Sequence, residues 1–209
     1  DYLEKINLND AVLGPFFGVM WIVLLFLIPG ITMGLFASEK VNGTQELLLT
    51  SPITIWELVL GKYIAGAVFS ACLVLVAAFF TGILFLYGDP EFWRTISGLL
   101  GLLLLSWSYV AVGAFASSVT RNQLIAFFLA LVLLLILWML AVVADLGAAG
   151  GTIGADSNLS EVMRFLSASD RFEKMVRGLV DTRDLAYFAF MIGVFLVFTK
   201  TSVESARWR

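Results

Sequence analysis

The chain has 209 residues, of which 60% are apolar and only 14% are charged. A soluble domain averages roughly 25% charged residues. A chain of this length has too small an interior to bury so much apolar surface, so lipid must solvate much of it. The net charge of −3 argues against nucleic acid as a partner. Histidine is absent and Cys72 is the single cysteine, so the chain can form neither an internal disulfide nor a His/Cys metal site.

Five apolar stretches approach or exceed the ~20 residues that a helix needs to cross about 30 Å of hydrocarbon. They are continuously apolar, whereas barrel strands alternate, so the sequence predicts an all-α polytopic membrane helix bundle. The expected spans cover about residues 11–37, 58–87, 96–119, 124–144 and 185–203. We interpret the whole chain, residues 1–209, as a single transmembrane domain. Pro29-Gly30 inside the first span predicts a kink there.

The lysines and arginines of short loops predict the orientation. One side would hold residues 38–57, residues 120–123 and the C-terminal tail, with Lys40, Arg121, Lys200, Arg207 and Arg209. On the other side, the long segment 145–184 balances five basic residues with seven acidic ones, and long segments count less. We therefore expect a multi-pass protein of the bacterial plasma (inner) membrane with a cytoplasmic C-terminus. Five spans then place Asp1 outside, so we expect a sixth span upstream of Asp1.

The outer segment 145–184 begins with a glycine-rich part, residues 147–154, that we expect to be a mobile loop. Two short amphipathic patterns follow it, with apolar residues at i, i+3, i+4 and i+7. Their members are Leu159, Val162, Met163 and Leu166, and then Phe172, Met175, Val176 and Leu179. Asn158 with Glu161, and Asp170 with Glu173, have the spacing of capped helix starts. Both helices are too short to span, so we expect them to lie at the outer face of the membrane.

Residues 38–57 read SEKVNGTQELLLTSPITIWE and change abruptly from polar to apolar. The pattern predicts a short helix ending near Thr50, because Pro52 forbids its continuation. Thr54 and Glu57 have the spacing of a capping box for the second span. A short capped helix at a cytoplasmic turn would suit a soluble partner. The alternative is a plain connecting loop whose leucines dip into lipid.

This segment resembles a known family. The run Glu39-Lys40-x-x-Gly43-Thr44-x-Glu46-Leu47-Leu48-Leu49-Thr50-Ser51-Pro52-Ile53, followed by ELVLGK at residues 57–62, is similar to the type-2 permeases of ATP-binding-cassette (ABC) transporters. It is most similar to their gliding-motility and nitrous-oxide-reductase-maturation branch. The stretch DTRDLAYF at residues 181–188 and the tail Val203-Glu204-x-x-Arg207-Trp208 also resemble that branch. The resemblance covers essentially the whole chain.

The resemblance implies a permease subunit with six spans that couples ATP hydrolysis by a separate cytoplasmic ATPase to export of a substrate. The segment between the first two visible spans would be the coupling helix that docks on that ATPase. The expected coupling residues are Glu39, Lys40, Gly43, Thr44, Glu46, Leu47, Leu48, Ser51 and Pro52. Lys62 is expected to be a membrane-interface anchor that extends its ammonium outward. Glu39 could pair with Lys40, with Lys62 or with the partner.

The chain itself is expected to be non-catalytic. It has no P-loop pattern, so ATP and magnesium would bind to the partner ATPase, and this chain would bind no cofactor and no metal. No charge lies near the middle of a span, which argues against a proton-coupled transporter. The different class of function that stays open is a non-transporting membrane scaffold, which would transmit ATPase motion to a periplasmic partner.

The further partners expected are lipid, a second permease copy or a homologous permease, and a periplasmic or outer-face protein. Small residues recur along the third span, where Gly113-x-x-x-Ser117 has the spacing of close helix packing. This packing could occur within the chain or across a dimer. Nothing in the sequence indicates the substrate.

Overall fold

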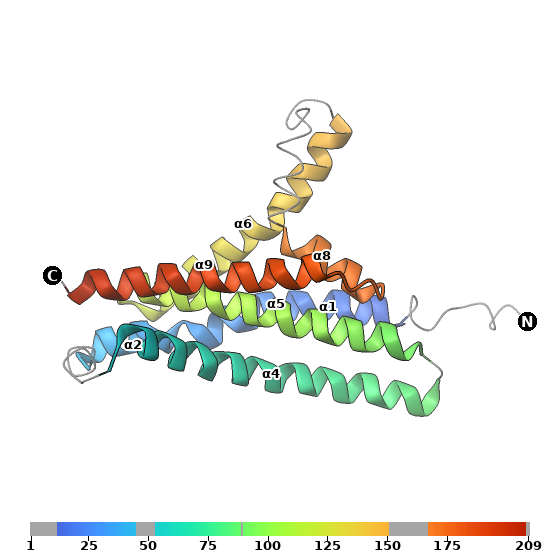
Figure 1. Cartoon of the computed structure of the whole chain (residues 1–209), viewed down its shortest axis with the longest axis horizontal. Helices are drawn as coiled ribbons and strands as arrows, with labels where there is room; N and C mark the ends of the chain where they lie inside the picture. Colours follow the sequence, from blue (N-terminus) through green and yellow to red (C-terminus); the bar gives the residue numbers. More distant parts are fainter. Residues whose placement is uncertain (1–11, 45–52, 89, 151–166, 208–209) are drawn as a thin grey trace, which may run out of the picture.

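The computed structural model describes residues 12–44, 53–88, 90–150 and 167–207, and in this part of the chain every regular element is a helix (Figure 1). The helices are α1 (Gly14–Thr32), α2 (Gly34–Asn42), α4 (Ile55–Tyr87), α5 (Phe92–Val119), α6 (Gln123–Gly150), α8 (Ala168–Val176) and α9 (Thr182–Arg207).

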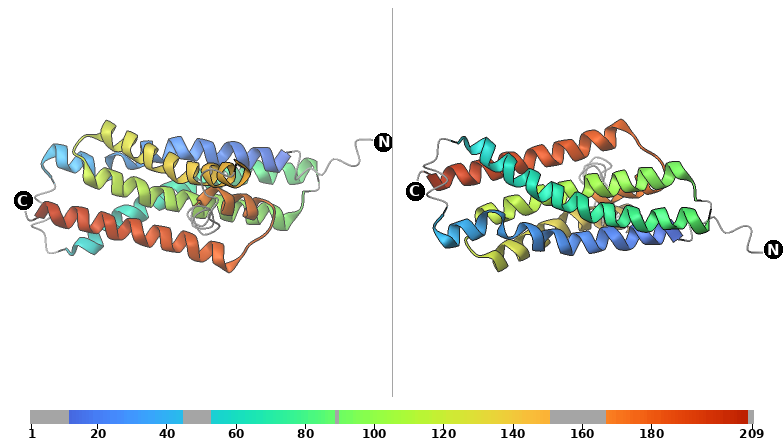
Figure 2. Two further views of the ribbon diagram at one scale, coloured as in Figure 1. Left: turned by 90° about the horizontal axis from the view of Figure 1, so that it is seen from above. Right: turned by 90° about the horizontal axis from the view of Figure 1, so that it is seen from below.

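Five of these helical segments are long and apolar enough to cross a membrane, with α1 and α2 together forming the first of them. The prediction of an all-α polytopic bundle with five visible spans is therefore confirmed. Helices α1, α4, α5 and α9 run roughly along one axis, and α6 is inclined to them (Figures 1 and 2). We call the end of the bundle where α2, α5 and α9 end and α4 begins the tail end, and the opposite end, where α8 packs, the α8 end (Figure 1).

Helix α5 occupies the middle of the bundle and contacts α1, α2, α4, α6, α8 and α9. Its glycines make this possible because each leaves room for a side chain of a neighbouring helix. A Cβ atom on Gly98 would lie 2.6 Å from the Phe17 ring, and one on Gly113 would lie 2.0 Å from the Thr32 hydroxyl. The small residues of α5 therefore serve packing within the chain, which is one of the two interpretations that the sequence left open.

The first span breaks at Met33, which lies between α1 and α2. Pro29 lies inside α1, one turn before the break, and its carbonyl accepts from the Met33 N–H over 2.9 Å. Because proline lacks an N–H and crowds the turn that precedes it, its direct effect falls on residues 25–29 and not on Met33. The Thr32 hydroxyl donates to the Ile28 carbonyl over 2.8 Å, so one carbonyl near the break is bonded by a side chain. The sequence predicted a kink at Pro29-Gly30, whereas the helix is continuous there and is interrupted at Met33. Helix α2 then continues the span to Asn42, beyond the expected end at residue 37.

Helix α8 lies across the bundle with Phe172 and Met175 buried, and both side chains pack against Gly101 of α5. Two details correct the sequence analysis. The N-cap of α8 is Ser167, whose side chain makes no capping hydrogen bond, and Asp170 lies in the first turn of the helix. Leu179 lies beyond the helix and is exposed, since Gly178 ends the turn with a φ of 88°.

The segment 145–184 is more helical than expected. Helix α6 continues to Gly150, where the sequence predicted a mobile loop from residue 147, and α9 begins at Thr182. The alanines of this run favour helix, so the helix continues past Gly147. The end of α6 rises away from the other helices (Figure 1). The amphipathic pattern at residues 159–166 lies outside the described residues.

Candidate functional site

Four of the expected coupling residues, Glu39, Lys40, Gly43 and Thr44, lie at the tail end, beyond the break at Met33 that creates a second helix start inside the first span. The N–H groups of a first helical turn have no partner within the helix. Here the Ser117 hydroxyl of α5 accepts from the N–H of Phe36 over 3.0 Å and from that of Ala37 over 3.1 Å. The same hydroxyl donates to the Met33 carbonyl over 2.8 Å. One serine of α5 therefore caps α2 from outside.

Glu39 and Lys62 join α2 to α4. The Glu39 carboxylate lies 2.5 Å from the Lys62 ammonium, and their side chains are 26% and 16% exposed. Lys62 also donates to the Leu35 carbonyl, and its ammonium lies 4.7 Å from the centre of the Phe36 ring. The structure thus selects one of the three partners open for Glu39. Lys62 is bonded to α2 here, and its expected role as a membrane-interface anchor stays a prediction.

The carbonyl of Ser118 is a second junction at the tail end. It accepts from the Lys40 ammonium of α2 and from the Ser202 hydroxyl of α9, the latter over 3.0 Å. The last carbonyls of a helix lack partners within the helix and carry partial negative charge. Lys40 and Ser202 therefore stabilise the end of α5 and hold α2, α5 and α9 together at one point.

The segment between α2 and α4 begins and ends with local signals that the structure contains. Gly43 ends α2 with a φ of 71°, a left-handed conformation that favours glycine. Thr44 follows it and is exposed. At the other end, the Thr54 hydroxyl accepts from the Glu57 N–H over 3.3 Å, and the Glu57 carboxylate accepts from the Thr54 N–H over 2.8 Å. This reciprocal pair is the capping box expected at the start of α4.

The remaining expected coupling residues lie outside the described residues: Glu46, Leu47, Leu48, Ser51 and Pro52. The structure describes both attachments of their segment. On the α2 side, Glu39 and Lys40 tie the helix to α4 and α5. On the α4 side, the Lys200 ammonium of α9 lies 5.5 Å from the centre of the Trp56 ring. The helices at the two ends of this segment therefore contact α5 and α9 through described side chains.

Sequence reasoning missed three members of this site, namely Ser117, Ser118 and Ser202. Ser117 was noticed only as a small packing residue. All three lie more than 75 residues from their partners in sequence. The available signal was the pair of hydroxyl residues in the last turn of a span, where unbonded carbonyls need donors.

In the part of the chain that the structure describes, no three acidic or cysteine side chains gather as a potential metal site. The hydroxyls of Ser106 and Ser108 in the middle of α5 donate to carbonyls of their own helix, over 2.7 and 3.0 Å. Trp107 packs between helices and donates to the Ala67 carbonyl over 3.2 Å. These polar groups are therefore explained by bonds within the bundle.

Comparison with known proteins is consistent with this architecture. No curated protein matches the chain. A family model described as ABC-2 family transporter protein matches residues 1–204, nearly the whole chain. The chain therefore belongs to the ABC-2 family of transporter proteins and is a membrane-spanning permease subunit of an ABC transporter, with α5 at the centre of five helical segments long and apolar enough to cross a membrane.

Proposed function

We propose that this permease couples ATP hydrolysis by a separate cytoplasmic ABC ATPase to export of a substrate. The tail end would face the cytoplasm, and the segment between α2 and α4 would dock on the ATPase. The family implies such an ATPase partner, and permeases of this kind are generally non-catalytic. ATP and magnesium would bind to that partner. Two permease copies, or two homologous permeases, would form one transporter.

The observation that supports this proposal best is the set of polar contacts behind the proposed docking segment. Glu39 joins α2 to α4, and Lys40 joins α2 to the end of α5. Ser202 brings α9 to the same α5 carbonyl. Ion pairs and hydrogen bonds in a partly buried setting have defined geometry, so they transmit displacement better than leucines sliding in lipid. A push on the segment would move α2, α4, α5 and α9 together.

The docking contact itself would use residues on the segment. Leu47 and Leu48 would supply the buried anchor, and Glu46 would pair with a basic residue of the ATPase, because apolar anchors within a polar rim carry most binding energy at interfaces. Gly43 would allow close approach of the two backbones, and Thr44, Ser51 and Pro52 would shape the segment's ends.

The experiment is to measure ATPase stimulation by the permease in proteoliposomes, with the cassette ATPase co-expressed from the neighbouring genes. We expect Glu46→Ala and Leu48→Ala each to lower stimulation at least tenfold while the permease still inserts and folds. Glu173→Ala, which removes an exposed carboxylate of α8 at the opposite end of the bundle, is the control and should retain stimulation. Full stimulation by both docking variants would overturn the docking proposal.

The alternative function is a membrane scaffold of the gliding-motility and nitrous-oxide-reductase-maturation kind, which would pass ATPase motion to a periplasmic partner. The observation that favours it is the continuity of α9, which runs from Thr182 at the α8 end to Arg207 at the tail end. Asp184 of α9 pairs with Arg171 of α8 over 2.6 Å, so motion at one end would reach α8 through one helix. ATP-dependent movement of a solute in proteoliposomes would favour export, and a stable periplasmic partner without such movement would favour the scaffold.

A further inference from the structure

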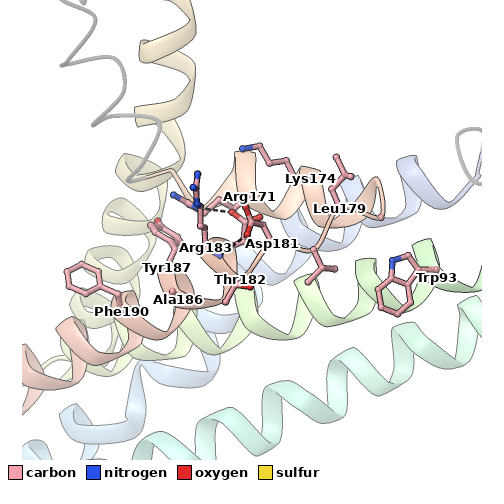
Figure 3. Close-up of a pocket in the computed structure, with 13 residues that line it drawn as sticks. Trp93, Arg171, Lys174, Leu179, Asp181, Thr182, Arg183, Ala186, Tyr187 and Phe190 are labelled. Carbon is pink, nitrogen blue, oxygen red and sulfur yellow. Dashed lines mark hydrogen bonds and ion pairs between the residues drawn. The ribbon is translucent and has the colours of Figure 1, made fainter.

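A surface groove of about 1190 Å³ lies at the α8 end, along α8, the turn that follows it and the first turns of α9 (Figure 3). Ligand sites for small molecules typically occupy about 300–1,000 Å³, so the groove has room for a larger amphiphile. Charged side chains line one part of it, and aromatic and aliphatic side chains line the rest. None of the residues discussed for ATPase coupling belongs to this groove.

Arg171 and Asp184 form the floor of the groove. Their side chains are 11% and 5% exposed, and the guanidinium lies 2.6 Å from the carboxylate. The same guanidinium lies 4.5 Å from the centre of the Tyr187 ring. Because the two charges neutralise each other and are largely buried, this pair fixes α8 against α9 and adds little net charge to the groove.

Lys174 and Arg183 supply the positive charge of the rim. Lys174 extends from α8 and Arg183 from the first turn of α9, and both are exposed (Figure 3). Among the residues that the structure describes, neither side chain forms an ion pair. The Asp181 carboxylate also lines the rim, but it accepts from the Arg183 N–H over 3.2 Å at the start of α9. The rim therefore has an excess of one positive charge.

The apolar wall continues from the rim into the membrane-spanning part of α9. Ala186, Tyr187 and Phe190 line it, and Phe190 is 59% exposed. Phe190 lies roughly 12 Å along the helix from Thr182, where α9 begins. Trp93 at the start of α5 also lines the groove, and tryptophan and tyrosine are enriched at the boundary between membrane and water. Positive charge at the water side and aromatic surface on the lipid side match the two parts of a phospholipid.

We propose that this groove binds an anionic phospholipid of the leaflet that surrounds the α8 end. Its phosphate and headgroup lie between Lys174 and Arg183, and one acyl chain lies along Ala186 and Phe190. Basic pockets between membrane helices recognise acidic headgroups in this way. The bound lipid fills the angle between α8 and α9 and holds α8 on the bundle. This binding site is independent of the ATPase-coupling proposal.

The test is native mass spectrometry of the full chain, released from detergent after incubation with phosphatidylglycerol or with phosphatidylcholine. The wild-type chain should retain phosphatidylglycerol in preference to phosphatidylcholine. Lys174→Gln and Arg183→Gln should each weaken that retention by roughly fivefold, the effect of one basic residue near an anionic headgroup. Arg177→Gln removes the same charge from α8, but this residue is exposed, pairs with Glu173 and does not line the groove. It should retain phosphatidylglycerol like the wild type.

A second variant separates lipid binding from simple attraction of charge. Ala186→Trp leaves every charge in place and fills the apolar wall, so it should abolish retention of phosphatidylglycerol. Retention by Ala186→Trp at the wild-type level would overturn the proposal, as would an equal loss in Arg177→Gln. Displacement of the lipid by millimolar inorganic phosphate would identify a free-anion site and would also overturn it.

Discussion

Helix α4 is more apolar than helix α5, yet a smaller share of it is buried. The most apolar stretch of α4 has a mean hydropathy of 2.5, yet only 22% of its residues are buried, whereas the corresponding stretch of α5 has a mean hydropathy of 1.9 and is 67% buried. Lipid is as apolar as leucine, so apolarity does not drive a membrane helix into the protein. Close packing through small residues and hydrogen bonds does, and α5 has both.

The two helices also carry different side chains. α5 turns glycines and serines toward its neighbours, and the hydroxyl of Ser117 bonds to the backbone of another helix. α4 turns large apolar side chains away from the bundle, such as Phe69, Phe79 and Leu86. At the tail end, Lys62 of α4 pairs with Glu39 and donates to the Leu35 carbonyl of α2. The comparison therefore predicts that substitutions on α5 destabilise the protein even when they add or remove few atoms. Substitutions on the exposed face of α4 should have little effect on stability even when the side chain is large.

The largest effect is expected from Gly113→Leu on α5. A Cβ at this position would lie 2.0 Å from the Thr32 hydroxyl and 2.7 Å from its Cβ, so α1 and α5 must separate. Overpacking of a tight contact typically costs about 1–3 kcal/mol, and two backbones that must move apart exceed the upper value. We expect loss of monodisperse protein on size-exclusion chromatography. Gly82→Leu on α4, where no atom lies within 4 Å of the new Cβ, is the control and should elute like the wild type. Similar elution profiles for Gly113→Leu and Gly82→Leu would contradict the proposed difference in packing between α5 and α4.

The next effect is expected from Ser117→Ala. The change leaves the N–H groups of Phe36 and Ala37 and the Met33 carbonyl without this partner, and each unsatisfied buried group costs about 1–3 kcal/mol before relaxation. We expect a fall of several degrees in the Tm measured by tryptophan fluorescence in detergent. Ser205→Ala is the control, because Ser205 is exposed and donates only to Ser202 in its own helix. A Tm fall no greater than that of the control would refute the capping role of Ser117.

A smaller effect is expected from the Glu39–Lys62 pair. A double-mutant cycle with Glu39→Gln and Lys62→Met should give a coupling free energy of about 1 kcal/mol, because both side chains are mostly buried. The matched pair is Glu173 and Arg177 at the α8 end, whose side chains are 64% and 66% exposed. Its coupling should fall below about 0.5 kcal/mol. Coupling energies of the same size in both cycles would mean that burial does not distinguish the two pairs.

The smallest effect is expected from Phe79→Leu on the exposed face of α4. Phe79 is 69% exposed, and one apolar side chain replaces another there. The free energy of unfolding should change by less than about 0.5 kcal/mol, measured as a near-constant Tm. A change as large as that of Ser117→Ala would show that another surface covers this face, and analytical ultracentrifugation of wild type and variant would then identify a dimer contact.

The sequence predicted the features that depend on one stretch of chain. A span must be apolar over about 20 residues whatever it packs against, so the five spans were predictable. The capping box at Thr54 and Glu57 is equally local. The break in the first span was not predicted at its actual position, because it lies at Met33 and not at Pro29-Gly30.

The tertiary partners were not predictable in the same way. Glu39 had three candidate partners, and only the position of α4 selects Lys62. The sequence favours Asp170 as the start of α8, because aspartate caps helices well, but the helix begins at Ala168, which is buried. The groove at the α8 end joins Lys174 to Arg183 and Trp93, which belong to three different helices. No sequence period marks such a site.

The proposed function depends on which end of the bundle receives the ATPase, and cross-linking tests this most directly. With Cys72→Ser as background, single cysteines at Thr44 on the tail end and at Leu179 on the α8 end would carry a photoactivatable maleimide. The complex with the co-expressed ATPase would then be illuminated and resolved on a gel. Our account predicts a cross-link to the ATPase from Thr44→Cys and none from Leu179→Cys. A cross-link from Leu179→Cys, or a stable complex without a cross-link from Thr44→Cys, would contradict it.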